Sequence, residues 1–557
     1  MARLLRYSVI SVLFLFISIP GWAAGGSCPT AQNYLNSSTG ALTTLSSLGV
    51  TNCYFVAADG ADSNSGTSET SPWLHAPGMP NCSGTCASTN PGAGTGFIFR
   101  GGDTWHYGAG TPATGGSWTW SWAGTSGSPI YVGVDPNWYS GSMWVRPLLN
   151  GDNPITASTA LSSCSYDEST MAFANIAVGY VTFDNFEILG GCWHSTQNGN
   201  GLCCLVYIGS GTETTHNIII SNNYLHGWSH VRFSCGSGGG SGNCDGAQGI
   251  SGDSHQDACP GCQLVRNVID GSDSDSSSFS AVLWNCYDAH QNVIRYNSNG
   301  FVCNNMHTFH DNLIEYISES SDGQTHSNGF EFNAESAATN TVYNNVVRHN
   351  TAAVVGWLNP SQTDYFFNNI YYDNGGSGAQ IVDVDPTGGG TSLYIWNNTF
   401  LGGTVGANGS WEGKLQGNIF CDSSAIGSPV SSGSEINWTT AQCYNAGYIS
   451  SASDSADVIA PTSSNCNGVT PCAAGYAANQ TLTCSTYPSL CTAYTAPGSA
   501  LLGVGYNSGS HAVIYPNYNG GPRLTSGSWD AGAYLYAGAG SGGNSPNPPS
   551  GLSAVVN

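Results

Sequence analysis

Two polar segments form the densest constellation of side chains that could perform acid–base chemistry. They read "CDGAQGISGDSHQDACPG" (244–261) and "SDGQTHSNGFEFNAE" (321–335). The candidate catalytic residues are Asp245, Asp253, Asp257, Glu331, His255 and His326, and Asn328 is a candidate for substrate binding. Cleavage of a glycosidic bond needs a proton donor and a base or nucleophile, typically two carboxyl groups at a set separation. The histidines could bind substrate or tune the pKa of a carboxyl group, unless these residues only hydrogen-bond the backbone at turns.

A repeated asparagine predicts the elements that position these residues. In "DYFFNNIYYDNGG" (364–376), two asparagines interrupt an aromatic run, and asparagine tolerates the left-handed backbone region needed at a bend. Similar units recur, with a corner residue at Asn223, Asn267, Asn292, Asn312, Asn345, Asn369, Asn398 and Asn418, and a looser copy at 181–189. The shortest spacing, 20 residues, suits one coil of a parallel β-solenoid, and longer spacings up to 44 need an inserted loop or a missed coil.

Alignment on the corner asparagine separates the core-facing positions from the outer ones. The residues three before the corner are apolar, namely Ile220, Leu264, Ala289, Phe309, Val342, Phe366, Ile395 and Leu415. The residues two after it are equally apolar, namely Leu225, Ile269, Ile294, Ile314, Val347, Tyr371, Phe400 and Phe420. Both columns should face the core, and the asparagines should stack about 4.8 Å apart with their amides bonded in a ladder.

An aromatic stripe occupies the outer position two residues before the corners. It contains His290, His310, Tyr343, Phe367 and Trp396, and Tyr365 and Tyr394 reinforce it two positions earlier. Flat exposed rings suit stacking against the apolar faces of sugar rings, so we regard all seven as candidates for substrate binding. Alternatively, a loop or the terminal cap covers the stripe as a secondary core.

Charged residues form a second outer column, three positions after the corners. Its members are His226, Asp270, Arg295, Glu315, Arg348 and Tyr372. The alternating signs predict ion pairs between adjacent coils that hold the register. The segment "DGSDSDSSS" (270–278) could instead offer oxygen ligands to calcium through Asp270, Asp273 and Asp275, although such a segment is also typical of a solvated loop.

Composition limits the compartment and the partners. The first 24 residues combine Arg3 and Arg6 with an apolar run and small residues, which predicts a secretory signal peptide and a secreted, extracellular protein. Twenty cysteines then indicate disulfides, including a loop disulfide in "CPGC" (259–262). Only 8% of residues are charged and the formal net charge is −24, so we expect no nucleic-acid or membrane partner. We expect a monomer.

Further strand-like segments place the chain in a known fold class. The segments "AVLWNC" (281–286), "GFVCNN" (300–305) and "GFEFNA" (329–334) precede the corners in register, so each coil has at least two faces. This all-β pattern resembles the right-handed parallel β-helix of the pectate-lyase-like superfamily over roughly residues 165–425. Segments 54–73, 97–105 and 520–536 resemble the first and last strands of such proteins. The expected organisation is a signal peptide (1–24), an N-terminal cap with the first coils (25–164), the β-helix core (165–425), a Ser/Cys-rich, disulfide-stapled C-terminal cap (426–536) and a flexible tail (537–557).

The resemblance implies a secreted polysaccharide-degrading enzyme that binds an extended extracellular glycan along the β-helix face. It favours a polysaccharide lyase over a glycoside hydrolase, and a lyase would use an arginine or lysine base such as Arg232, Arg266 or Lys414, with Ca²⁺ as the expected cofactor. The two polar segments also share a pattern, His255-x-Asp257 and His326-x-Asn328, and if the coils are in register these four residues lie on one corner of the helix. The alternative is a non-catalytic glycan-binding or adhesin-like β-helix protein.

Overall fold

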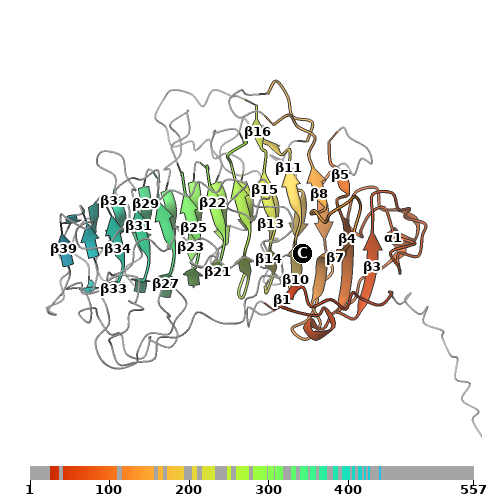
Figure 1. The fold of residues 1–557 in the computed structure, drawn as a ribbon, viewed down its shortest axis with the longest axis horizontal. Coiled ribbons are helices and arrows are strands. Elements are labelled where there is room, and N and C mark those ends of the chain that lie inside the picture. The colour runs from red at the N-terminus through yellow and green to blue at the C-terminus, as the bar shows by residue number, and fades with distance from the viewer. Residues whose placement is uncertain are drawn as a thin grey trace, which may run out of the picture.

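The chain folds into a solenoid of stacked coils. The computed structural model describes residues 25–36, 42–108, 116–155, 161–166, 172–193, 204–209, 216–231 and, with gaps, the strands and corners from 248 to 440. Within these residues, three parallel sheets run along the solenoid (Figure 1). Strand β3 (Asn52–Val56) lies near one end and strand β39 (Trp438–Thr440) at the other. The predicted parallel β-helix is confirmed.

The strands of each sheet pair in chain order. Sheet A contains β3, β4 (Thr95–Gly101), β7 (Ile130–Tyr139), β10 (Val181–Asp184), β14 (Ile219–Ser221), β18 (Gln263–Val265), β21 (Asp288–His290), β24 (Thr308–His310), β27 (Thr339–Tyr343), β30 (Thr363–Phe367), β33 (Ser392–Trp396) and β36 (Glu412–Gln416). Sheet B contains β5 (Thr104–His106), β8 (Leu148–Asn150), β11 (Glu187–Leu189), β15 (Tyr224–His226), β19 (Val268–Asp270), β22 (Val293–Arg295), β25 (Leu313–Glu315), β28 (Val346–Arg348), β31 (Ile370–Tyr372), β34 (Thr399–Leu401), β37 (Ile419–Cys421) and β39. Sheet C contains β6 (Trp118–Trp120), β9 (Ala174–Ile176), β13 (Cys204–Ile208), β17 (Gln248–Gly252), β20 (Ser280–Asn285), β23 (Asn299–Asn305), β26 (Asn328–Asn333), β29 (Ala352–Leu358), β32 (Gln380–Pro386), β35 (Thr404–Ala407) and β38 (Ser424–Ile426).

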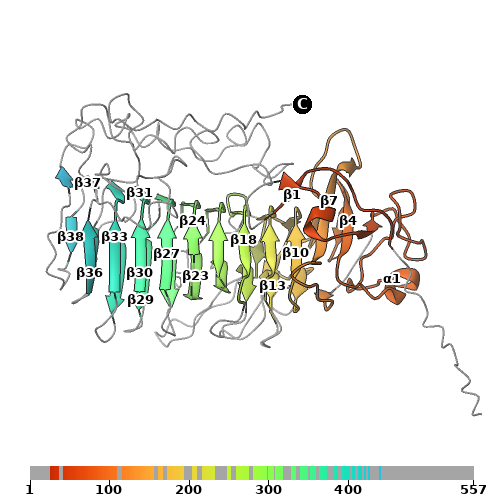
Figure 2. The same cartoon turned by 90° about the horizontal axis from the view of Figure 1, so that it is seen from below.

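Short elements lie outside the three sheets. They are the antiparallel pair β1 (Tyr34–Leu35) and β2 (Leu42–Thr43), the parallel pair β12 (Cys192–Trp193) and β16 (Ser229–His230), the helix α1 (Gly84–Ser88) and a 3-10 turn (Ser46–Leu48). Figure 2 shows several strands of sheet A side by side along the solenoid, with α1 near its amino-terminal end. Among the described residues, no helix has the length and apolar character needed to cross a lipid bilayer.

The predicted asparagine ladder is present where sheet A turns into sheet B. We define the ladder as the side chains of Asn223, Asn267, Asn292, Asn312, Asn345, Asn369 and Asn398, each at most 1% exposed. In each ladder asparagine from Asn223 to Asn369, Nδ2 donates a hydrogen bond to the Oδ1 of the next asparagine of the ladder. The Nδ2–Oδ1 distances are 2.9 to 3.1 Å. That Oδ1 also accepts the backbone N–H of the preceding asparagine. Asn418 lies outside the described residues.

The second amide hydrogen of each asparagine ties the ladder to the core. In Asn292, for example, Nδ2 also donates to the carbonyl oxygen of Leu264 at 2.8 Å, one coil earlier. All seven members of the ladder make this bond to the carbonyl of a core-facing residue. Buried polar groups must find partners, and these side chains satisfy both their donors and their acceptor inside the coil.

The residue before each ladder asparagine makes the bend. Its φ lies between +52° and +58° in Asn222, Arg266, Gln291, Asp311, Asn344, Asn368 and Asn397. This left-handed conformation is uncommon outside glycine, and asparagine and aspartate adopt it more readily than most residues. In the looser copy at 181–189, Asn185 has this conformation and Phe186 takes the ladder position. The Phe186 N–H donates to Asn223 Oδ1 at 2.9 Å, so the ladder begins one coil later.

The two apolar columns align as predicted. Each of the eight members of the first column pairs with the next in sheet A, and each of the second column does so in sheet B. In the first column the members from Ile220 to Ile395 are buried, and in the second column the members from Leu225 to Tyr371 are buried. All of them belong to one continuous core. The amides that stack at the bend therefore fix which side chains face inward.

Disulfides reinforce several described loops. Cys28–Cys53, Cys82–Cys86, Cys164–Cys192 and Cys259–Cys262 are bonded, so the predicted loop disulfide in 259–262 is present. The first pair joins the amino-terminal segment to β3. Most of the predicted C-terminal cap and all of the tail lie outside the described residues.

Candidate functional site

Glu331 lies on the outer side of sheet C. Its neighbour Phe330 faces the core, and strand pairing places Glu331 between Val302 and Val355 of the adjacent coils. Asn328 donates from Nδ2 to Glu331 Oε2 at 3.1 Å, and both residues are buried. The structure thus brings together two of the predicted site residues on strand β26.

The remaining predicted catalytic residues lie outside the described residues, and their roles stay predictions. They are Asp245, Asp253, Asp257, His255 and His326. The strands next to these residues are described, and they show where each of the two polar segments meets sheet C. Register places Gln248 of β17 level with Asn328 of β26, through Ser280 and Asn299. Residues 253–257 therefore follow the carboxyl end of β17, whereas His326 precedes the amino end of β26.

This register corrects the alignment of the two polar motifs. The shared pattern His-x-Asp and His-x-Asn suggested equivalent positions, but Asn328 begins a strand and Asp257 comes after one. Because the strands are parallel, the chain enters every strand of sheet C at the same edge and leaves it at the opposite edge. A matching pattern of three residues does not determine how strands pair. The alternation of apolar residues does, because it sets the register.

The aromatic stripe lies on the outer side of sheet A, in the predicted register. Tyr343 stacks on His310 with ring centroids 4.7 Å apart and on Phe367 at 5.2 Å, and His290 stacks on His310 at 4.7 Å. These rings are parallel to within 6°. Tyr365 and Tyr394 stack in the same way at 5.0 Å.

Stacking changes how this stripe could meet a ligand. Both faces of His310 and of Tyr343 lie against neighbouring rings, and Phe367 and Trp396 are only 3% and 7% exposed. A flat sugar-on-ring contact, the mode that the sequence suggested, therefore has no open ring face at His310 or Tyr343. What these half-buried side chains present outward is ring edges and polar atoms, and their role in substrate binding stays a prediction.

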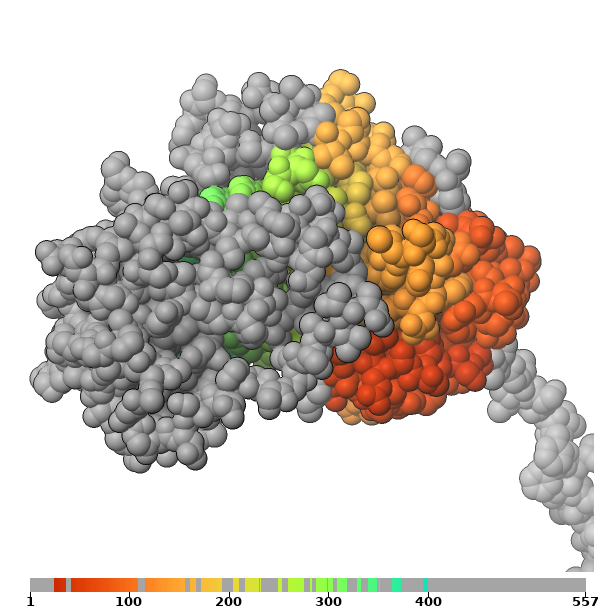
Figure 3. Space-filling model, in the orientation of Figure 1, coloured from red at the N-terminus to blue at the C-terminus, as the bar shows by residue number. Residues whose placement is uncertain are grey.

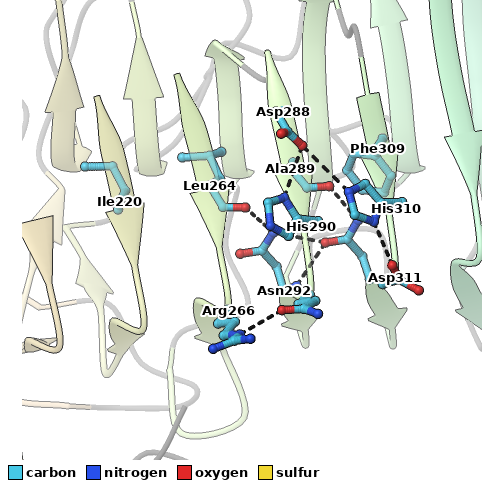
Figure 4. Close-up of polar contacts among 12 residues, drawn as sticks. Ile220, Leu264, Arg266, Asp288, Ala289, His290, Asn292, Phe309, His310 and Asp311 are labelled. Carbon is cyan, nitrogen blue, oxygen red and sulfur yellow. Dashed lines mark hydrogen bonds and ion pairs between the residues drawn. The ribbon is translucent and has the colours of Figure 1, made fainter. Parts of the chain in front are cut away.

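Carboxylates gather at the histidine end of the stripe (Figure 4). His290 Nδ1 lies 3.1 Å from Asp288 Oδ1, and His310 Nε2 lies 3.9 Å from the same oxygen. His310 Nδ1 is 2.6 Å from Asp311 Oδ2. Burial lowers the pKa of His290 and outweighs the opposing hydrogen bond from Asp288. We call Asp288, His290, His310 and Asp311 the His–Asp cluster.

Sequence reasoning identified the two histidines of this cluster but missed the two aspartates. Asp288 belongs to the same outer column as Tyr365 and Tyr394, four residues before the ladder position. Asp311 is the left-handed residue before Asn312. Both positions could have been found by scanning every outer column for ionisable residues, because strand alternation places Asp288 and His290 on one side.

The charged column on sheet B is buried. His226, Asp270, Arg295 and Glu315 are each at most 6% exposed and follow one another in register. Arg295 donates to Asp270 Oδ2 at 2.6 Å, which confirms an ion pair between adjacent coils. Arg348 and Tyr372 continue the column along the backbone.

Two of the three predicted calcium ligands contact protein groups. Asp270 is fully buried against Arg295 and accepts the N–H of Ser272 at 3.0 Å. Asp273 accepts hydrogen bonds from His226 and from the N–H of Gly227. Asp275 lies outside the described residues, so calcium binding by this loop stays a prediction.

His226 joins two carboxylates. Its Nδ1 lies 2.8 Å from Asp273 Oδ2 and its Nε2 lies 3.0 Å from Glu187 Oε1. Burial disfavours the charged imidazole, but the hydrogen bonds to Asp273 and Glu187 outweigh it and raise the pKa of His226 to about 9. His226 should therefore be a cation at neutral pH, and its ring stacks on Tyr224.

The pKa of His226 predicts a loss of stability in alkali. Because the folded-state pKa exceeds the value of 6.5 for a free histidine, the contribution is complete below pH 6.5 and disappears as the pH rises through about 9. One pKa unit corresponds to ~1.4 kcal/mol, so the loss should approach ~3 kcal/mol. Urea unfolding at pH 6 and pH 9.5 measures it. The His226→Gln variant should have a smaller difference between the two pH values, and an equal difference would contradict the assignment.

No protein-family model matches the chain, and no curated protein matches its sequence. Three solved structures are similar in fold: pectate lyase Pel9A (16% identity, 87% of this chain, 96% of that chain, TM-score 0.43), a GH136 lacto-N-biosidase from Eubacterium ramulus (14%, 70%, 67%, 0.39) and a rhamnogalacturonan lyase (13%, 69%, 84%, 0.33). At these identities the likeness concerns the fold alone, which the strand pairing of the chain establishes independently.

Proposed function

We propose that the protein is a secreted carbohydrate-active enzyme that cleaves an extended polysaccharide. The observation that carries this proposal is the Glu331–Asn328 pair on the outer side of sheet C. A carboxyl group that lies between valine positions and accepts a hydrogen bond from the Asn328 amide could serve as a general acid or base. The disulfide-bonded loops fit an oxidising, extracellular compartment.

A second carboxyl position supports hydrolysis. Register continues from Glu331 through Val355 to Asp383, so Asp383 occupies the same outer column two strands away. Two strand spacings amount to ~9.6 Å between backbones. Inverting glycosidases hold their carboxyl groups about 6.5–9.5 Å apart to leave room for a water molecule. We assign Glu331 as the acid and Asp383, whose backbone spacing from Glu331 lies just above the upper end of that range, as the base.

Elimination is the second candidate chemistry, and one arginine favours it. A lyase needs a basic group that can abstract a proton, and burial lowers the pKa of Arg266 to about 10. Arg266 nevertheless donates from Nε to Gln291 Oε1 at 2.7 Å. Arg295 is committed to Asp270. Arg232 lies outside the described residues. The side chain of Lys414 also lies outside the described residues, so Arg232 and Lys414 stay candidate bases. We place hydrolysis first because Arg266 and Arg295 are both held by neighbouring side chains.

The products distinguish the reactions. The purified full-length protein would be incubated with a panel of neutral and acidic polysaccharides, with calcium or with chelator. Hydrolysis gives new reducing ends without ultraviolet absorbance, whereas elimination gives both, because it leaves a double bond. Binding to a glycan without new ends would instead identify a non-catalytic glycan-binding protein, and neither cleavage nor binding across the panel would contradict the proposal.

A further inference from the structure

Three side chains of the His–Asp cluster hold metal-ligating atoms close together. One ligand atom each from Asp288, His290 and His310 lies within 4.8 Å of the other two. Asp288 Oδ1 is 3.1 Å from His290 Nδ1 and 3.9 Å from His310 Nε2. Asp288 and His290 come from strand β21, and His310 comes from the neighbouring strand β24 in register with His290. All three side chains are partly exposed, at 12–24%, so an ion could reach them from solvent.

Asp311 supplies a second, independent feature of a metal site. Its Oδ2 lies 2.6 Å from His310 Nδ1, which fixes the proton on that nitrogen and turns the lone pair of Nε2 toward Asp288. Metal-ligating histidines usually donate their other N–H to a carboxylate or carbonyl in this way. The left-handed backbone at Asp311 places this carboxylate beside the ring.

The donor set selects the class of cation. Two imidazole nitrogens and one carboxylate oxygen suit zinc and its neighbours among the transition metals, whereas calcium prefers oxygen ligands alone. Three protein ligands leave at least one coordination position for solvent or another ligand. We propose that the His–Asp cluster binds one divalent transition cation of the zinc type, with Asp288, His290 and His310 as ligands and Asp311 holding His310.

Binding requires a small rearrangement of side chains. Ligand atoms about 2.1 Å from a tetrahedral zinc ion lie ~3.4 Å apart. The Asp288–His290 distance of 3.1 Å already fits once the proton between these two atoms has moved to His290 Nε2 or to solvent, and His310 must approach Asp288 from 3.9 Å. The two parallel rings must tilt toward the ion and give up part of their stacking. The strong negative charge of the chain, −24, favours cation binding in general, so the test must resolve this site from weak surface binding.

Metal titration of the full-length protein tests the proposal, and it does not depend on the reaction proposed above. Chelator-treated protein would be titrated with Zn²⁺ by calorimetry, in excess Ca²⁺, and with Co²⁺ by visible absorption. We expect one equivalent of Zn²⁺ that Ca²⁺ does not displace, and a Co²⁺ spectrum typical of nitrogen and oxygen ligands. X-ray absorption of the zinc-loaded wild type should show two imidazoles and no sulfur, a readout that needs no variant.

Variants then assign the ligands. Asp311→Asn should weaken Zn²⁺ binding ~10–100-fold, as loss of a supporting carboxylate typically does, and His290→Ala and His310→Ala should weaken it further. His106→Ala is the matched control, because His106 pairs with Asp152 away from the cluster and its loss should leave the affinity unchanged. Circular dichroism would verify that each variant is folded. Unchanged affinity in both cluster histidine variants, a sulfur ligand, or no stoichiometric zinc binding by the wild type would overturn the proposal.

Discussion

Replacing Glu331 with glutamine should lower the rate of polysaccharide cleavage by roughly 10²–10⁴-fold, the usual contribution of a positioned general acid or base. Glutamine has nearly the same shape and can still accept the hydrogen bond from Asn328, so the coil should remain intact. The loss should appear mainly in kcat, because the amide cannot transfer a proton at neutral pH but still fills the same space. Steady-state kinetics on the substrate identified by the polysaccharide panel measure the effect.

The matched control is another carboxylate changed to its amide. Asp59, which is largely exposed and pairs with Arg100 near the amino-terminal end, is suitable, and Asp59→Asn should retain full activity. If Glu331→Gln keeps the rate of the wild type while its circular dichroism is unchanged, Glu331 has no part in the chemistry, and the undescribed carboxylates Asp245, Asp253 and Asp257 become the main candidates.

Replacing Asn345 with alanine should produce the largest loss of stability. The buried amide of Asn345 donates to Asn369 and to the carbonyl of Phe309. Its oxygen accepts both the N–H and the side-chain amide of Asn312. Alanine leaves several of these groups in the core without a hydrogen-bond partner, and each such group costs about 1–3 kcal/mol. We expect a loss of at least ~3 kcal/mol, measured as a shift of the urea unfolding curve.

A second asparagine calibrates that loss. The side chain of Asn64 makes one bond, to the carbonyl of Pro72, at a partly buried site in the amino-terminal region. Asn64→Ala should therefore cost only about 1 kcal/mol. Equal shifts for the two variants would mean that the ladder contributes no more than an ordinary hydrogen bond.

The fold was predictable from the sequence because its determinant repeats. Each corner asparagine occurs with an apolar residue three before and another two after it, and a side chain that faces the wrong way would bury a polar group or expose a core residue. The shift at 181–189 shows the limit of this reasoning. Phe186 takes the ladder position there, and Asn185 supplies only the bend.

The candidate site was less predictable because it does not repeat. The sequence alone indicated that His290 and His310 share a column, but not that their rings stack on each other or that Asp288 and Asp311 lie beside them. These contacts depend on side-chain torsions and on the left-handed corner. The similarity between the segments around His255 and His326 was misleading for a related reason, since a short polar motif carries no information about strand register.

The uniform bonding of the ladder has a consequence for how such a chain changes in length. Asn292 and Asn312 lie 20 residues apart, and each bonds its neighbours through the same atoms. Loss of residues 292–311 would bring Asn312 opposite Asn267 with an equivalent set of partners. Gene duplication or deletion in steps of one turn could thus lengthen or shorten the molecule in evolution while the surrounding turns keep their sequences.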